Sequence, residues 1–95
     1  MEEHRDASNR LTFEFLNIES SLYEKVTNEI VKQFELEPTN ELVKGLDEIF
    51  QEYKKGKCII GLEWDNWSGY IVNAKDNASE SLANEIADFL KGKYE

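Results

Sequence analysis

The chain has a single cysteine and a single histidine among 95 residues, which limits the chemistry it can carry. One cysteine cannot form an internal disulfide, so the fold is not a cystine-stabilised scaffold. Cys58 and His4 together do not make a zinc site, and nothing in the sequence brings them together as a nucleophile pair. We expect Cys58 to be a buried structural thiol. The five glycines form no phosphate-binding loop. Because the sequence offers no zinc-ligand set, no nucleophile pair and no such loop, we expect no enzyme activity, no metal site and no cofactor.

Basic residues are scarce and long apolar runs are missing. The 11 Lys and Arg residues face 20 Asp and Glu residues, a formal net charge of −9 at pH 7. This balance argues against nucleic acid and against an anionic membrane surface as the ligand. No stretch approaches the roughly 20 apolar residues of a membrane span, and the charged start of the chain is not a signal peptide. We expect a cytoplasmic protein whose acidity either keeps it soluble or attracts a basic protein partner.

Apolar residues are nevertheless sufficient for one small domain. Hydrophobic residues make up 40% of the chain and aromatic residues 12%. The length fits one compact domain and leaves no room for a second. Residues 1–9 are polar and are predicted to be a loose leader, and residues 10–95 are predicted to form a single domain.

The N-terminal half shows two clear patterns. Apolar and polar residues alternate over Leu11–Phe15, which predicts a half-buried strand. Apolar residues at helical spacing predict a helix over residues 21–35. Ser21 and Glu24 have the spacing of a capping box at its start.

The C-terminal half predicts a hairpin and a helix. Residues 58–64 and 70–74 are rich in β-branched and aromatic residues and are separated by turn-forming residues, so we predict an antiparallel hairpin. A last helix is predicted to begin at Asn77 or Ser79 and to end at Gly92.

The segment between these halves permits two interpretations. Apolar spacing over residues 40–55 fits a helix that is capped by Thr39 or Asn40 and closed by Gly56, and we favour that helix. The alternative is a strand over residues 49–53 that turns through Gly56 into the next strand. The favoured order is β-α-α-β-β-α, an α+β fold in which a small antiparallel sheet packs against two or three helices.

The segment from residue 63 to residue 70, Glu-Trp-Asp-Asn-Trp-Ser-Gly-Tyr, has an unusual local composition. Trp64 is in phase with Ile60 and Leu62, so it is predicted to pack into the core. Trp67 falls in the turn, where it either packs over the sheet edge or stays exposed as an anchor for a partner. Trp and Tyr dominate the binding energy of protein interfaces.

This string, followed by an apolar strand and an amphipathic helix, resembles the C-terminal part of small acidic bacterial proteins. Some of those proteins resemble the immunity proteins that neutralise polymorphic toxins. The resemblance covers roughly residues 58–91 and implies a non-enzymatic protein that binds and occludes a basic toxin domain. The residues we predict to bind the partner are Glu63, Asp65, Asn66, Trp67 and Tyr70.

A second functional class stays open. The strand over residues 58–64 is apolar on both faces, with Ile59 on one and Ile60 on the other. The alternative is therefore a small structural or regulatory protein that forms a homodimer through an exposed sheet face or an edge strand.

Overall fold

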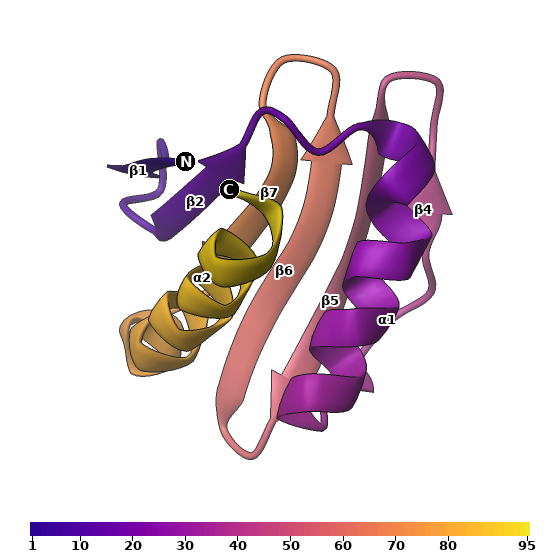
Figure 1. Cartoon of the computed structure of the whole chain (residues 1–95). Coiled ribbons are helices and arrows are strands. Elements are labelled where there is room, and N and C mark those ends of the chain that lie inside the picture. Colours follow the sequence, from indigo (N-terminus) through magenta and orange to yellow (C-terminus); the bar gives the residue numbers. More distant parts are fainter.

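The computed structural model describes residues 1–95 and shows a seven-stranded antiparallel sheet with two α-helices on one face (Figure 1). The strand order across the sheet is β1-β2-β7-β6-β5-β3, and β4 also pairs with β5. The strands are β1 (Glu2–Arg5), β2 (Leu11–Phe15), β3 (Glu37–Pro38), β4 (Val43–Lys44), β5 (Glu48–Lys55), β6 (Cys58–Asp65) and β7 (Gly69–Ala74). The predicted α+β class is confirmed.

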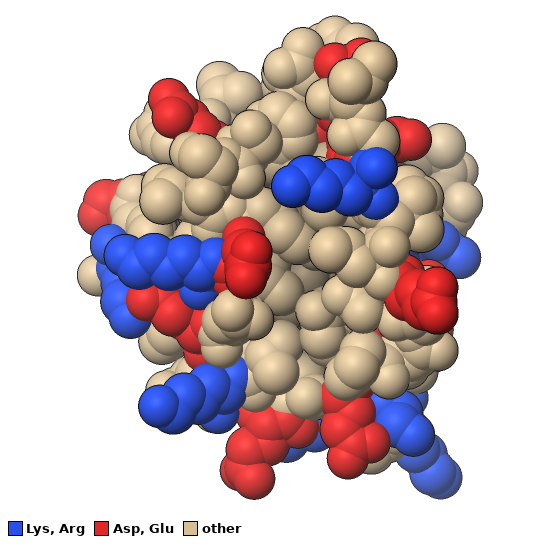
Figure 2. Space-filling view, turned by 90° about the vertical axis from the view of Figure 1, so that its right-hand side faces the viewer, with Lys and Arg blue, Asp and Glu red and all other residues tan.

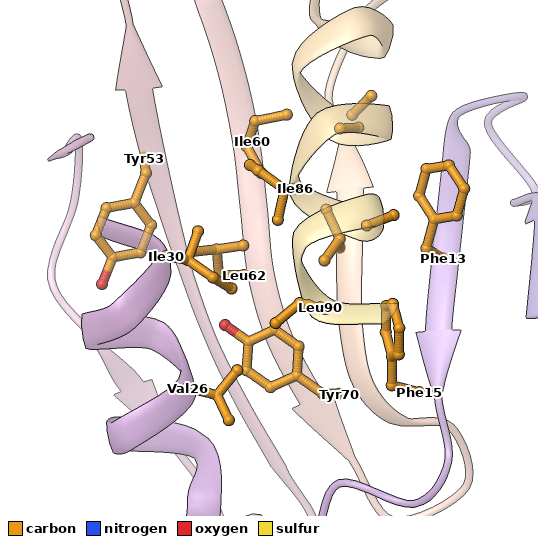
Figure 3. Packing of buried hydrophobic residues seen from close by; sticks show 14 of the residues in the cluster. Phe13, Phe15, Val26, Ile30, Tyr53, Ile60, Leu62, Tyr70, Ile86 and Leu90 are labelled. Carbon is orange, nitrogen blue, oxygen red and sulfur yellow. The ribbon is translucent and has the colours of Figure 1, made fainter. Parts of the chain in front are cut away.

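The core lies between the sheet and the two helices, α1 (Tyr23–Phe34) and α2 (Glu80–Tyr94). Each helix follows a short 3₁₀ turn, η1 (Ser20–Leu22) or η2 (Asn77–Ser79). The helices project apolar side chains onto the alternating inward side chains of the strands, as Figure 3 shows. Fully buried members of this layer include Phe13, Val26, Ile30, Ile60, Leu62, Ile86 and Leu90.

Residues 40–55 contain strands, so the predicted second helix is wrong and the alternative strand is confirmed. Ile49 and Tyr53 are buried on the core face of β5. Positions four apart fit a helix and a strand equally well, which is why this spacing misled the prediction. Gly56 has a φ of +59° and closes the β5–β6 hairpin instead of ending a helix.

The element order therefore differs from the prediction. It runs β1-β2-α1-β3-β4-β5-β6-β7-α2, with two α-helices. The N-terminal residues predicted to be loose include β1, which pairs with β2 at the edge of the sheet. Asp6 shapes the turn between these two strands, because its Oδ1 accepts hydrogen bonds from the backbone N–H groups of Ser8 and Arg10.

The predicted helix ends also need correction. Neither α1 nor α2 has a side-chain hydrogen bond from its N-cap residue, so the Ser21 capping box does not form. Asp76 instead accepts a hydrogen bond from the backbone N–H of Ser79, at the start of η2. The last helix continues through Gly92 to Tyr94.

The open face of the sheet, the face turned away from the helices, carries a cluster of polar side chains on β6 and β7. Lys75 Nζ lies 2.8 Å from Glu63 Oε2 on this face. Gly61 makes room for the pair, since a Cβ there would lie 2.7 Å from Lys75 Cε. Nearby, Asn73 donates a hydrogen bond to Thr12 Oγ1. The same face also carries the apolar residues Ile59, Ile71 and Phe50.

Candidate functional site

Two β-turns lie side by side at one end of the sheet, the upper end in Figure 1. One connects β4 to β5 and the other connects β6 to β7. They are joined by a hydrogen bond from the backbone N–H of Asn66 to the carbonyl oxygen of Asp47, with an N–O distance of 3.0 Å. We call residues 45–47 and 65–69 the paired turns. They present Leu46, which is fully exposed, and Trp67, which is 77% exposed.

Hydrogen bonds within the β6–β7 turn fix the backbone so that the Trp67 side chain points outward. Asp65 Oδ1 accepts hydrogen bonds from the backbone N–H groups of Trp67 (2.9 Å) and Ser68 (2.7 Å), which is the usual way that Asp fixes a tight turn. Gly69 closes the turn with a φ of +74°. The exposed alternative for Trp67 is therefore the one that the structure adopts.

Three carboxylates, those of Asp47, Glu48 and Asp65, lie in or next to the paired turns. Glu48 lies directly opposite Asp65 in the β5–β6 register. Asp47 and Glu48 are both exposed. The paired turns thus combine large apolar side chains with acidic neighbours at one end of the molecule.

The five predicted partner-binding residues fall into three groups. Asp65, Asn66 and Trp67 are together in the β6–β7 turn. Glu63 lies two residues back along β6, and its carboxylate is held by Lys75. Tyr70 requires correction, because its side chain is fully buried and unavailable to a partner.

Tyr70 lies in the core between the two helices, as Figure 3 shows. Its hydroxyl is 2.7 Å from Thr27 Oγ1, and its ring centroid is 5.5 Å from that of Tyr23. Burial raises the pKa of Tyr70 well above its ordinary value. Trp64 is half-buried, packs against the core as predicted and donates from Nε1 to the carbonyl oxygen of Ile18 at 3.0 Å.

The sequence prediction missed the half of this surface that comes from the β4–β5 hairpin. Its exposed apolar side chains are Leu42, Val43, Leu46 and Phe50. The apolar spacing over residues 40–55 predicts a helix whose stripe would bury most of them. Gly45 lies shortly before β5 and Gly56 directly after it, and glycines at such positions are the signal that favours a hairpin.

Two cavities flank this end of the protein. The first has a volume of about 270 Å³ and lies beside Trp67, between the end of β2 and the end of α2. The second, of about 410 Å³, lies between α1 and β5 and is lined mainly by hydroxyl, amide and tyrosine side chains. Figure 2 shows the side of the molecule that carries α1 and β5, where a hollow lies in a mostly uncharged area with charged side chains around it.

The structure contains no group of three or more His, Cys, Asp or Glu side chains that could hold a metal ion. Cys58 is half-buried, and its thiol lies 3.5 Å from the carbonyl oxygen of Ala78. His4 Nε2 lies 2.8 Å from Glu14 Oε2, at the opposite edge of the sheet from β5.

Comparison of the chain with protein-family models, with curated proteins and with solved structures found no match. Neither helix combines the length and the apolar character that a membrane-crossing helix requires. The geometry of the paired turns and the charge of the chain are therefore the features that bear on its function.

Proposed function

We propose that this protein is a non-enzymatic protein-binding module, and most concretely an immunity-type protein that binds and occludes a basic toxin domain in the cytoplasm. The observation that carries the proposal is Trp67, a large aromatic side chain held 77% exposed on a turn that is fixed by hydrogen bonds. The resemblance of residues 58–91 to small acidic bacterial proteins supplies the more specific function.

An exposed Trp on an ordered turn is suited to anchor an interface. Trp is among the residues that contribute most when an interface buries them. Its turn is already held by Asp65 and by the neighbouring hairpin, so binding would order few additional backbone groups. Leu46 on the adjacent turn extends the apolar area that a partner would cover.

The acidic surroundings favour a basic partner. The chain carries a net charge of −9, and Asp47 and Glu48 are exposed beside Trp67 and Leu46. Opposite charges on two proteins accelerate their encounter and disfavour wrong partners. A basic toxin domain fits this surface, and covering its active surface would inhibit it by occlusion.

A growth assay tests this function. The gene immediately upstream is expressed alone and then together with this protein, and we expect the neighbour to be toxic and co-expression to restore growth. Trp67→Ala should abolish the rescue while leaving the free energy of unfolding within about 0.5 kcal/mol, because the side chain is exposed. The double charge reversal Asp47→Lys and Glu48→Lys should also weaken the rescue.

Lys57→Ala is the matched control, since Lys57 is exposed in the β5–β6 turn at the opposite end of the sheet. It should protect as well as the wild type. A harmless neighbour, a neighbour that still kills, or full protection by Trp67→Ala would each contradict the proposal.

One observation favours the homo-oligomer as a second candidate. Val43 lies directly opposite Phe50 in the β4–β5 register, and both side chains are partly exposed. Two copies joined through this apolar pair would bury it. Light scattering over a dilution series tests this: a dimer that persists on dilution, and that Phe50→Ser dissociates, would support it, whereas a monomer throughout would exclude it.

A further inference from the structure

The cavity beside Trp67 has aromatic and acidic walls. Its volume is about 270 Å³, and it opens between the β6–β7 turn, the end of β2, the start of β1 and the end of α2. No Lys, Arg or His side chain lines it, and its one cation, the N-terminal ammonium of Met1, is paired with the carboxylate of Glu95. Its lining side chains include Phe15, Leu16, Trp67, Tyr94, Glu2 and Glu14.

Two of these acidic residues oppose each other without enough positive charge to balance them. Glu2 lies directly opposite Glu14 in the β1–β2 register, and like charges in that position destabilise a sheet. His4 contacts Glu14, with 2.8 Å between Nε2 and Oε2. Glu2 has no ion-pair partner, and Arg5, the other basic residue of β1, is bound to Glu80. A cation entering this cavity would relieve the repulsion.

The aromatic wall narrows the choice of cation. Arg stacks on the face of Trp and can pair with a carboxylate through two parallel hydrogen bonds. The cavity offers both features, because Trp67 lines one part of it and the Glu2–Glu14 pair another. A lysine ammonium would match the charge but not the planar shape.

We propose that this cavity receives an arginine side chain from the protein partner. In the complex, the guanidinium would stack on Trp67 and pair with the carboxylates of Glu2 and Glu14. The identity of the donor as a toxin domain rests on the proposed function, whereas the preference of the cavity for a guanidinium can be measured on the isolated protein.

The test is an NMR titration of the full-length protein with a capped peptide, acetyl-Gly-Arg-Gly-amide, at constant ionic strength. The readout is the indole N–H of Trp67, and the half-buried indole of Trp64, which is bonded to Ile18, is the internal control. We expect a saturable shift of the Trp67 signal alone, with a dissociation constant on the order of 1 mM.

The control ligand is the same peptide with citrulline, which keeps the planar shape of arginine and lacks its charge. It should bind about tenfold more weakly, because charge-assisted hydrogen bonds are lost. Glu14→Gln and Glu2→Gln, which preserve the shape of the cavity, should each weaken the arginine peptide by about threefold or more. Equal binding of the two peptides, or unchanged binding to both variants, would overturn the proposal.

The outcomes separate this site from the proposed function. If the arginine peptide binds at Trp67 but the growth assay shows no rescue, the cavity preference stands and the immunity function fails. If rescue is intact but no Trp67 shift saturates, the arginine site fails and the immunity function stands.

Discussion

Gly69 is the residue on which the shape of the β6–β7 turn depends most directly. Its φ of +74° is unfavourable for any residue with a Cβ, and a Cβ there would lie 2.3 Å from the carbonyl oxygen of Phe15. We expect Gly69→Ala to lower the free energy of unfolding by about 2 kcal/mol or more. Urea denaturation followed by circular dichroism measures the change.

Gly92 provides the control for that substitution. It is exposed in α2, and a Cβ there would meet nothing within 4 Å. Gly92→Ala should leave stability unchanged or raise it by up to about 1 kcal/mol, since Ala favours helices. If Gly69→Ala proved as stable as Gly92→Ala, the close approach of β2 to the turn would be wrong.

The two tryptophans show how far sequence reasoning reaches at this scale. Alternation along β6 was enough to place Trp64 against the core, and the structure confirms this. The exposure of Trp67 comes with a turn that Asp65 fixes locally, and the end of β2 packs against Gly69 in that turn, a contact between segments that are about fifty positions apart. No local pattern encodes such a contact. Tyr70 shows the converse, because its alternation with Val72 and Ala74 already indicated the core face.

At the scale of elements, the start of α2 is controlled by Asp76. Its Oδ1 accepts hydrogen bonds from Ser79 N and Ser79 Oγ, and Ser79 Oγ accepts one from the backbone N–H of Ile59 in β6. We expect Asp76→Ala to lower the free energy of unfolding by about 1 kcal/mol, as for other capping residues. Asn77→Ala should change it by less than about 0.5 kcal/mol, because that exposed side chain makes no hydrogen bond. Thermal denaturation compares the two, and the reverse order would show that Asn77 is the cap.

The strand β1 depends in part on one titratable contact. The hydrogen bond between His4 and Glu14 raises the pKa of His4 above the ordinary value of 6.5. A raised folded pKa means that the charged pair stabilises the fold fully below about pH 6.5, and that this stability is lost as the pH rises through the folded pKa. The difference in free energy of unfolding between the wild type and His4→Gln should therefore be largest at about pH 6 and smallest at about pH 9. For such a surface pair the difference should not exceed about 1 kcal/mol.

An NMR titration checks the cause of that pH dependence, since His4 is the only histidine. Glu14→Gln should lower the pKa of His4, because it removes the charged partner. A pKa that stays the same in Glu14→Gln would attribute the shift to the other groups that raise it, the backbone carbonyl of Arg5 and then the carboxylate of Glu2.

Elements were predicted correctly where one hydrophobic period dominates. The prediction failed where the helical and strand periods coincide. Strict alternation defined β2, and the hairpin of β6 and β7 followed from β-branched residues around a turn. Residues 40–55 satisfied both helical and strand spacing, and pairing with β6 decided between them. The edge strand β1 was missed because it is entirely polar and gains its structure from tertiary contacts, which are its pairing with β2 and the ion pair of Arg5 with Glu80 in α2.

At the scale of the whole molecule, the excess of 20 acidic over 11 basic residues makes encounter with a basic partner sensitive to salt. Raising the salt from about 50 mM to about 500 mM should lower the association rate constant by about tenfold or more and change the dissociation rate constant much less. Trp67→Ala should do the opposite, mainly accelerating dissociation, because it removes a short-range contact and no charge. Surface plasmon resonance with the product of the upstream gene, the proposed partner, measures both rate constants. An association rate that hardly responds to salt would show that the acidic surface serves solubility and not steering, and the anchor at the paired turns would then carry the specificity alone.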